Sequence, residues 1–274
     1  MWETISNMQS LFTSGKFTII AALHLPPFPA SANPTAQPIP AIAEYAIRNT
    51  EKAVKAGVHA LYLQDLGDYP VAPGVQPHTV AGVTAVGAAI RREFPDLTIG
   101  VCLVSHGARE PLAIAQAVGA QFVRLKVYVG AMVKAEGVLQ GCAYEAVQYR
   151  AHVRAENIAI LADVYDRTGE PLARMPLAEE ARQAATFGRA DGLVLTGRSV
   201  DESVSMLSEI RAAKLGVPVL LGGGATTENI ARFRDLADGV IVSTAFKAVG
   251  GWSRESLSAD WDEARIAQFV RAAV

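Results

Sequence analysis

Eight short apolar runs recur along the chain, and stretches with helical periodicity separate them. The runs are four to seven residues long and rich in β-branched and aliphatic residues, as buried strands are. They are FTIIAAL from Phe17, ALYL from Ala60, IGVCLV from Ile99, FVRLKV from Phe122, IAILADV from Ile158, GLVLT from Gly192, VPVLL from Val217 and GVIVS from Gly239. Strands that are apolar almost throughout indicate a parallel sheet with a helical covering.

The intervening stretches predict amphipathic helices. They are Ile42 to Ala56, Thr79 to Phe94, Pro111 to Val118, Ala143 to Arg154, Leu177 to Phe187, Val200 to Lys214, Thr227 to Leu236 and a last one after Asp260. Eight strand–helix units in 274 residues fit a (β/α)₈ TIM barrel better than a doubly wound open sheet. We therefore predict one barrel domain over residues 1–274, with residues 1–16 as an N-terminal extension on its outside or bottom.

Composition narrows the classes of partner and location. Half of the residues are hydrophobic and 19% are charged, so the chain can bury a large core. A net charge of -2 and a pI near 6.2 give no basic field for nucleic acid. The two cysteines, Cys102 and Cys142, cannot build a disulfide framework, and no apolar run is long enough for a signal peptide or a membrane span. We expect a cytoplasmic protein without membrane or nucleic-acid partners.

The strand from Phe122 carries two cations on one face. Alternation along the strand places Phe122, Arg124 and Lys126 together. An unpaired charge inside a barrel is costly, so both cations need a partner. Either they form interior ion pairs with Asp163 and other acids, or they face an anionic substrate at the barrel mouth.

Other polar residues follow the expected strand ends, where barrel enzymes carry their chemistry. Asp163 ends an otherwise apolar strand and is a candidate for acid/base work or metal ligation, or for an interior ion pair. His24 is a candidate general base or orienting donor, or simply a hydrogen-bonded packing residue. Asp65 and Asp68, in LQDLGDYP, are ligands, acid/base groups or turn-forming carboxylates.

The stretch LLGGGATTEN places Gly222, Gly223 and Gly224 directly after a predicted strand. Glycine lets backbone N–H groups approach a ligand, and in barrels the loops after the seventh and eighth strands often bind phosphate. Ser243 and Thr244 follow the eighth strand, and Thr196 and Gly197 follow the sixth. The alternative is a tight turn into a helix capped by Thr226 or Thr227.

No HxH, HExxH or CxxC spacing occurs, so the sequence requires no cofactor, although Mg²⁺ held by Asp65 or Asp163 with substrate oxygens stays open. The segment from His24 to Pro40 holds six prolines and is long for such a loop. We expect it to shape a rim or a subunit contact, and a homo-oligomer.

Several segments together resemble the BtpA/SgcQ family of TIM-barrel proteins, in the same order from about Phe17 to Gly251. They are ALHLPPFPA, LQDLGDYP, QPHTVAGVTAVG, AIAQAVGAQFVRLKVYVGAMVKAEGVLQGCAYEAVQYR, ILADV, ADGLVLTG and PVLLGGGATTEN. The resemblance implies a phosphate-binding type of (β/α)₈ barrel. One family member is associated with photosystem I stability in cyanobacteria, and others resemble enzymes encoded beside sugar metabolism, with a nucleosidase-like label.

The chain departs from the family pattern at the expected barrel mouth. Ser105-His106-Gly107 replaces an Arg-Asn-Asp, Tyr165-Asp166-Arg167 stands where relatives have Lys-His after the aspartate, and Gln64-Asp65-Leu66-Gly67-Asp68 replaces Glu-Asn-Phe-Gly-Asp. These changes suggest a substrate different from the family's usual one, or altered catalysis.

The sequence thus predicts an enzyme acting on a phosphorylated small molecule, a sugar phosphate or a nucleotide-like compound. A lyase, an isomerase or a glycosidic-bond cleaving enzyme fits equally. The candidate catalytic residues are Asp163, Lys126, Arg124, His24 and Asp65, expected on the rim opposite the phosphate-binding set Gly222, Gly223, Gly224, Ser243, Thr244, Thr196 and Gly197. The alternative is a non-catalytic photosystem I assembly or stability factor.

Overall fold

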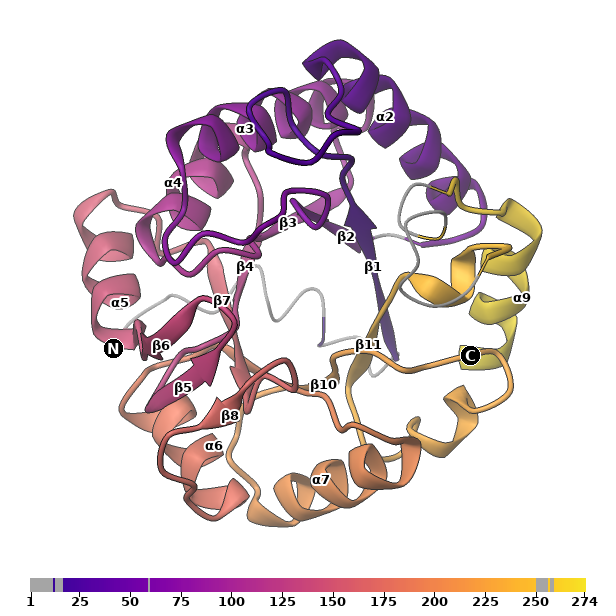
Figure 1. Ribbon diagram of the computed structural model, residues 1–274. Helices are drawn as coiled ribbons and strands as arrows, with labels where there is room; N and C mark the ends of the chain where they lie inside the picture. Colours follow the sequence, from indigo (N-terminus) through magenta and orange to yellow (C-terminus); the bar gives the residue numbers. More distant parts are fainter. Residues whose placement is uncertain (1–11, 13–16, 59, 250–255, 257–258) are drawn as a thin grey trace.

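The chain is a (β/α)₈ TIM barrel in which eight parallel strands close into one sheet (Figure 1). The computed structural model describes residues 12, 17–58, 60–249, 256 and 259–274, so the predicted N-terminal extension lies outside the described residues except for Phe12. Around the barrel the strands are β1 (Thr18–His24), β11 (Gly239–Val242), β10 (Val219–Leu221), β9 (Gly192–Leu195), β7 (Ala159–Val164), β4 (Phe122–Leu125), β3 (Thr98–Cys102) and β2 (Ala60–Gln64). All eight predicted strands are confirmed.

Helices form a ring outside the barrel, as Figure 1 shows. They are α2 (Ile39–Lys55), α3 (Pro77–Glu93), α4 (Arg109–Val118), α5 (Ala143–His152), α6 (Leu177–Thr186), α7 (Val200–Ala213) and α9 (Glu263–Ala273). Each helix places an apolar stripe against the outer face of the strands, which is why helical periodicity is a reliable guide to these elements. Among the described residues, no helix combines the length and apolar character that crossing a membrane requires.

The two faces of each strand pack into separate apolar layers. Val123 and Leu125 belong to the layer between barrel and helices, whereas Phe122 points into the barrel with Leu161. Arg124 pairs in register with Leu161, one position before the end of β4. The alternation predicted for this strand is therefore confirmed, and it carries Arg124 to the top of the interior.

One predicted helix is absent. The segment Thr227 to Leu236 contains only the short 3₁₀ turn η1 (Ile230–Arg232) and irregular turns. The side chain of Asn229 accepts a hydrogen bond from the backbone N–H of Thr226 at 2.7 Å and donates one to the Gly224 carbonyl at 3.0 Å. Asn229 therefore closes the glycine loop on itself, and a local side-chain bond replaces the predicted helix start.

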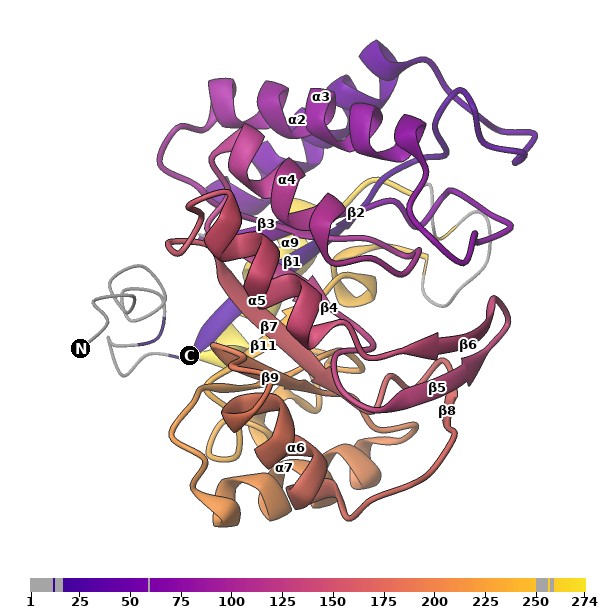
Figure 2. The same cartoon turned by 90° about the vertical axis from the view of Figure 1, so that its left-hand side faces the viewer.

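A small antiparallel sheet outside the barrel was not predicted. After β4 the chain forms a hairpin of β5 (Ala131–Lys134) and β6 (Gly137–Gln140), and the two-residue strand β8 (Glu170–Pro171) pairs with β5. Figure 2 shows this sheet extending from one end of the barrel, on the same side as the loop after β1. The hairpin tip reaches the barrel mouth, since Lys134, Ala135 and Glu136 line its cavity.

Candidate functional site

A cavity of about 740 Å³ opens at the carboxyl ends of the barrel strands. This is the end at which TIM-barrel enzymes carry their active sites, and the volume lies in the usual range of ligand pockets, roughly 300–1,000 Å³. Its lining brings together most of the residues singled out in the sequence: His24, Arg124, Lys126, Asp163, Thr196, Gly222, Gly223, Gly224, Ser243 and Thr244. Asp65 and Gly197 are not among the lining residues.

Arg124 and Asp163 form a buried two-pronged ion pair. Arg124 Nε and Nη2 donate to the two carboxylate oxygens of Asp163 at 2.8 and 3.0 Å, and Arg124 Nη1 donates to the Tyr62 hydroxyl at 3.0 Å. Asp163 is only 5% exposed and Arg124 only 9%. The pair holds both side chains rigidly at the floor of the cavity.

Burial shapes the ionisation of this pair. Removal from water raises the pKa of Asp163, and the Arg124 charge opposes that rise. Burial likewise acts against the charge on Arg124, but the Asp163 carboxylate outweighs it and holds the pKa of Arg124 well above its usual value. Arg124 is therefore a fixed cation, and its partner is the group whose proton affinity a ligand would change.

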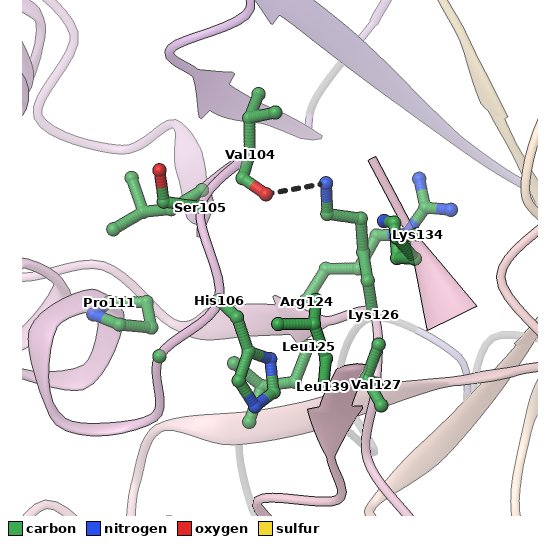
Figure 3. Close-up of a pocket in the computed structure, with 12 residues that line it drawn as sticks. Val104, Ser105, His106, Pro111, Arg124, Leu125, Lys126, Val127, Lys134 and Leu139 are labelled. Carbon is green, nitrogen blue, oxygen red and sulfur yellow. Dashed lines mark hydrogen bonds between the residues drawn. The ribbon is translucent and has the colours of Figure 1, made fainter. Parts of the chain in front are cut away.

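Lys126 has a different environment from Arg124. Its Nζ donates to the Val104 carbonyl at 3.0 Å, as the dashed line in Figure 3 shows, and the side chain is half-buried. No carboxylate of a described residue lies within ion-pair distance of it. Of the two alternatives left open for this strand, the ion pair with Asp163 applies to Arg124, while Lys126 forms no ion pair with a carboxylate of the described residues.

The loop after β7 adds two charged groups to the site, Asp166 and Arg167. Tyr165 has a left-handed φ of 58°, an uncommon and strained backbone for this residue type, and it turns Asp166 and Arg167 toward the cavity. Asp166 accepts a 2.6 Å ion pair from Lys134 at the hairpin tip. Burial disfavours the charge on Asp166, but Lys126 and Lys134 outweigh it and lower its pKa to about 2.

Arg167 is a cavity cation without an internal partner among the described residues. No hydrogen bond or ion pair joins it to another residue in the described part of the chain, although it lines the cavity and is half-buried. Burial and the Arg124 charge lower the pKa of Arg167. A cation in this position gains most from an anion that enters with a ligand.

The three glycines of the loop after β10 are required for different structural reasons. A Cβ on Gly222 would stand 2.1 Å from Thr196 Oγ1 and 3.1 Å from Arg124 Nη2, so only glycine fits there. Gly223 and Gly224 instead have positive φ angles of 153° and 82°. The N–H of Gly222 is used by the Leu195 carbonyl, whereas those of Gly223 and Gly224 have no acceptor among the described residues.

Thr196 and Arg167 lie beside this loop. Thr196 is 7% exposed, and its Oγ1 has no hydrogen-bond partner within the described part of the molecule. Arg167 Nη2 is 3.7 Å from the position that a Cβ on Gly223 would take. Gly223, Thr196 and Arg167 therefore lie close together in the cavity lining, and the Gly223 N–H, the Thr196 hydroxyl and the Arg167 guanidinium have no partner among the described residues.

His24 and Ser243 line the cavity at the ends of the neighbouring strands β1 and β11. Ser243 Oγ is 3.5 Å from His24 Nδ1. Burial, reinforced by the charges of Lys247 and Arg124, lowers the pKa of His24 to about 3. His24 is therefore a neutral imidazole at physiological pH, suited to accept or donate a hydrogen bond but not to supply charge.

Three predicted residues have structural contacts instead. Asp65 is 2% exposed and accepts the backbone N–H of Val104 at 2.7 Å, and Asp68 accepts that of Phe28 at 2.8 Å. These contacts match the turn-forming alternative and tie the loops after β1, β2 and β3 together. The Gly197 N–H donates to Ser203 Oγ at 3.1 Å, which leaves it unavailable to a ligand.

Metal binding has little support from the donor set. Among the described residues, no group of three or more His, Cys, Asp or Glu side chains is arranged to hold a metal ion. Both oxygens of Asp163 already accept from Arg124, which competes with any cation for the same lone pairs. Cys102 and Cys142 are both free thiols and both buried.

One residue of the expected division into two opposite rims, Arg124, lies beside the glycine loop and not opposite it. Arg124 approaches the glycine loop, because Gly222 has no side chain to keep it away. Sequence reasoning also missed Tyr62, Lys134 and Asp166 as cavity residues. The only signal for part of this set was the departure Tyr165-Asp166-Arg167 from the family pattern.

Comparison with known proteins agrees with this architecture. A model of the BtpA family matches residues 15–274. The chain belongs to the BtpA family. Within it, a protein of Archaeoglobus fulgidus described as uncharacterized is 33% identical over 258 residues, covering 93% of this chain and 98% of its own. The photosystem I biogenesis protein BtpA of Synechocystis is 29% identical over 257 residues, covering 93% of this chain and 87% of its own.

Solved structures outside the BtpA family share the fold at low identity. The tryptophan synthase α subunit of Legionella pneumophila has a TM-score of 0.57 and 15% identity, with 100% of this chain and 98% of that chain covered. At this identity the likeness shows a common TIM barrel and nothing about the reaction.

Proposed function

We propose that this BtpA family member is an enzyme acting on a phosphorylated small molecule, whose phosphate binds beside the glycine loop. The observation that carries the proposal is the convergence of unpaired donors there. The N–H groups of Gly223 and Gly224, Thr196 Oγ1 and the Arg167 guanidinium all lack an internal partner among the described residues and line the same cavity, with Gly223 beside both Thr196 and Arg167. Backbone N–H groups free of side chains, combined with a guanidinium, suit phosphate oxygens.

The charge of the cavity supports a dianionic ligand. Six cationic side chains line it, against four carboxylates. The cations are Arg124, Lys126, Lys134, Arg167, Lys247 and Arg265, and the acids are Glu136, Asp163, Asp166 and Glu228. A phosphate monoester carries about -1.5 to -2 charges at pH 7, which matches the cationic excess of two.

Lys126 and the Arg124–Asp163 pair would face the reacting part of the ligand. Asp163 would exchange a proton with the substrate, since burial raises its pKa toward the range in which a carboxyl group acts as general acid or base. Lys126 would stabilise negative charge that develops in the transition state. These roles suit a lyase, an isomerase or a glycosidic-bond cleaving enzyme.

Binding of orthophosphate and ribose 5-phosphate, measured by calorimetry, tests the proposal. Arg167→Gln and Gly223→Val should each weaken binding of both probes at least tenfold. Gly216→Val is the matched control for the glycine, because Gly216 also has a positive φ, 77°, and open space around it, but is not among the cavity-lining residues. Failure of both probes to bind the native chain, or unchanged binding in both site variants, would contradict the phosphate site.

A non-catalytic role in photosystem I biogenesis is the second candidate, taken from the name of the Synechocystis relative. The observation that favours it is an apolar face on the small sheet. Val133 and Val138 are cross-strand partners, 44% and 59% exposed, and Leu172 next to β8 is 63% exposed. Exposed apolar patches often mark protein contacts. This role predicts that Asp163→Asn is tolerated in a complementation assay, whereas Val133→Asp with Val138→Asp is not.

The predicted homo-oligomer and the cytoplasmic location stay predictions. Light scattering on the purified chain measures its mass in solution directly, and an epitope-tagged chain followed through cell fractionation tests the location.

A further inference from the structure

A second cavity, of about 260 Å³, lies beside the barrel mouth. It is bounded by the loop after β7 and by α6 and α7, and it shares three lining residues with the main cavity: Asp166, Arg167 and Thr196. Two of these, Arg167 and Thr196, are the groups that converge on the glycine loop. The side cavity therefore begins where the proposed phosphate site ends.

Part of the lining of the side cavity is apolar. Met175, Leu177 and Met206 line it together with the ring of Tyr165. Leu177, Met206 and Tyr165 are partly buried and pack against the layer between barrel and helices, so the wall is supported from behind. Methionine thioethers adapt to irregular shapes and make favourable contacts with aromatic rings.

Tyr165 holds a fixed ring at one side of this wall. Its hydroxyl donates to the Met175 carbonyl, and its φ of 58° sets the backbone direction. The Arg174 guanidinium lies 5.4 Å from the ring centroid, in a cation–π arrangement. A second flat group entering the cavity would meet a ring whose orientation is already set.

Several charged side chains that line the side cavity have partners of their own. Arg198 pairs with Glu170, and its backbone N–H donates to Glu202. Glu209 accepts the backbone N–H of Ala178 at 3.2 Å. Arg174 is stacked on Tyr165. The charged side chains that line the side cavity balance, with Arg167, Arg174 and Arg198 against Asp166, Glu202 and Glu209, so the cavity is suited to a group without net charge.

We infer that the side cavity is a subsite for a flat, uncharged aromatic or heteroaromatic ring belonging to the same ligand whose phosphate binds at Gly223 and Arg167. This inference rests on the proposed phosphate site and narrows the substrate class from phosphorylated small molecules to those that carry a ring. Arg167 then contacts the ligand at the junction between its phosphate-bearing part and its ring.

Calorimetry with a ring-less and a ring-bearing phosphate tests the inference. Ribose 5-phosphate is the probe without an aromatic ring, and uridine and adenosine 5′-monophosphates are the ring-bearing probes. We expect at least one nucleotide to bind the native chain ten or more times tighter than ribose 5-phosphate. Met206→Trp, which fills the side cavity, should remove that gain and leave the Kd of ribose 5-phosphate within twofold.

Two further variants keep the test decisive. Met175→Trp fills the same cavity from a loop position and should act like Met206→Trp if helix α7 tolerates no tryptophan. Ser205→Trp is the matched control, because Ser205 is exposed on the same helix and does not line the cavity. It should keep the full nucleotide gain.

The outcomes separate the two proposals. Equal affinity for ribose 5-phosphate and both nucleotides in the native chain, or a nucleotide gain that persists in both cavity-filling variants, overturns the ring subsite while leaving the phosphate site standing. Loss of ribose 5-phosphate binding in Arg167→Gln with no effect of Met206→Trp on any probe likewise overturns the ring subsite alone. Absence of binding by every phosphorylated probe overturns both.

Discussion

Arg124 and Asp163 are joined by two hydrogen bonds of 2.8 and 3.0 Å at the floor of the barrel cavity, and each is less than a tenth exposed. The two residues come from neighbouring strands, β4 and β7, whose register places Arg124 beside Leu161, two residues before the aspartate. The interaction is thus a product of strand pairing, and the same pairing aims a fixed cation at the glycine loop.

Removing one partner of this pair should lower the free energy of unfolding far more than removing both. Arg124→Met leaves the Asp163 carboxylate buried without a counter-charge, which costs about 3–5 kcal/mol of unfolding free energy. The double variant Arg124→Met with Asp163→Leu should recover most of that loss. Urea unfolding followed by circular dichroism measures the stability of both variants. Equal stability of the single and double variants would contradict this prediction.

The stability of the chain should show a pH dependence that originates at Asp65. Burial raises its pKa to about 6, against the opposing effects of the Val104 N–H and Lys126. A carboxyl group with a raised folded-state pKa contributes stability below its unfolded pKa of about 4 and loses it as pH rises through 6.

Asp65→Asn should remove the loss of stability at high pH, because the amide oxygen still accepts the Val104 N–H and carries no charge. The variant should be roughly 1–3 kcal/mol more stable than the native chain at pH 8 and about equal to it at pH 4, since two pKa units correspond to at most about 3 kcal/mol. Thermal unfolding at the two pH values provides the measurement. A stability difference that is the same at both would rule out ionisation of Asp65 as its source.

Gly222 should tolerate no side chain. The Cβ of Gly222→Ala would collide with Thr196 Oγ1 and Val194 Cγ1, at 2.1 and 2.6 Å, and the forced movement should cost about 1–3 kcal/mol. Gly130→Ala is a useful comparison, since Gly130 has a φ of 70° but open space, so that it reports backbone strain alone, of about 1 kcal/mol. Alanine at 222 should also displace Arg124. Equal losses in the two variants would mean that the collision is relieved at no cost.

The hairpin over the cavity should depend on Lys134. Its 2.6 Å ion pair with Asp166 connects the tip of β5 to the loop after β7, and both side chains are 5% exposed. Lys134→Met should therefore increase amide hydrogen exchange across residues 131–140 at least tenfold while leaving β4 and β7 protected. Lys55→Met, at an exposed i,i+4 pair with Glu51, is the control and should change nothing in the hairpin. Unaltered exchange in the Lys134 variant would show that strand pairing alone holds the hairpin.

Much of the barrel could be predicted from the sequence, because each apolar strand and each helical stripe is a local pattern. Such a pattern can pack against any apolar layer, so it does not depend on one particular partner. The period of the apolar residues decides strand or helix, and eight repeats decide closure. The same local patterns place Arg124, Lys126 and Asp163 at the strand ends, and the three consecutive glycines identify the loop after the seventh strand.

Only the tertiary structure decided how these groups are paired. Which of Arg124 and Lys126 meets Asp163 depends on strand register and on the reach of side chains, neither of which appears in a local pattern. Asp65 and Asp68 became structural because the backbone donors they satisfy belong to other loops, 39 and 40 residues distant in sequence. Likewise, the side chain of Asn229 hydrogen-bonds within its own loop, where a helix start was predicted. The strained turn at Tyr165 directs Arg167 into the site. Local periodicity determined the scaffold, whereas the chemistry of the mouth was determined by contacts between residues far apart in the chain.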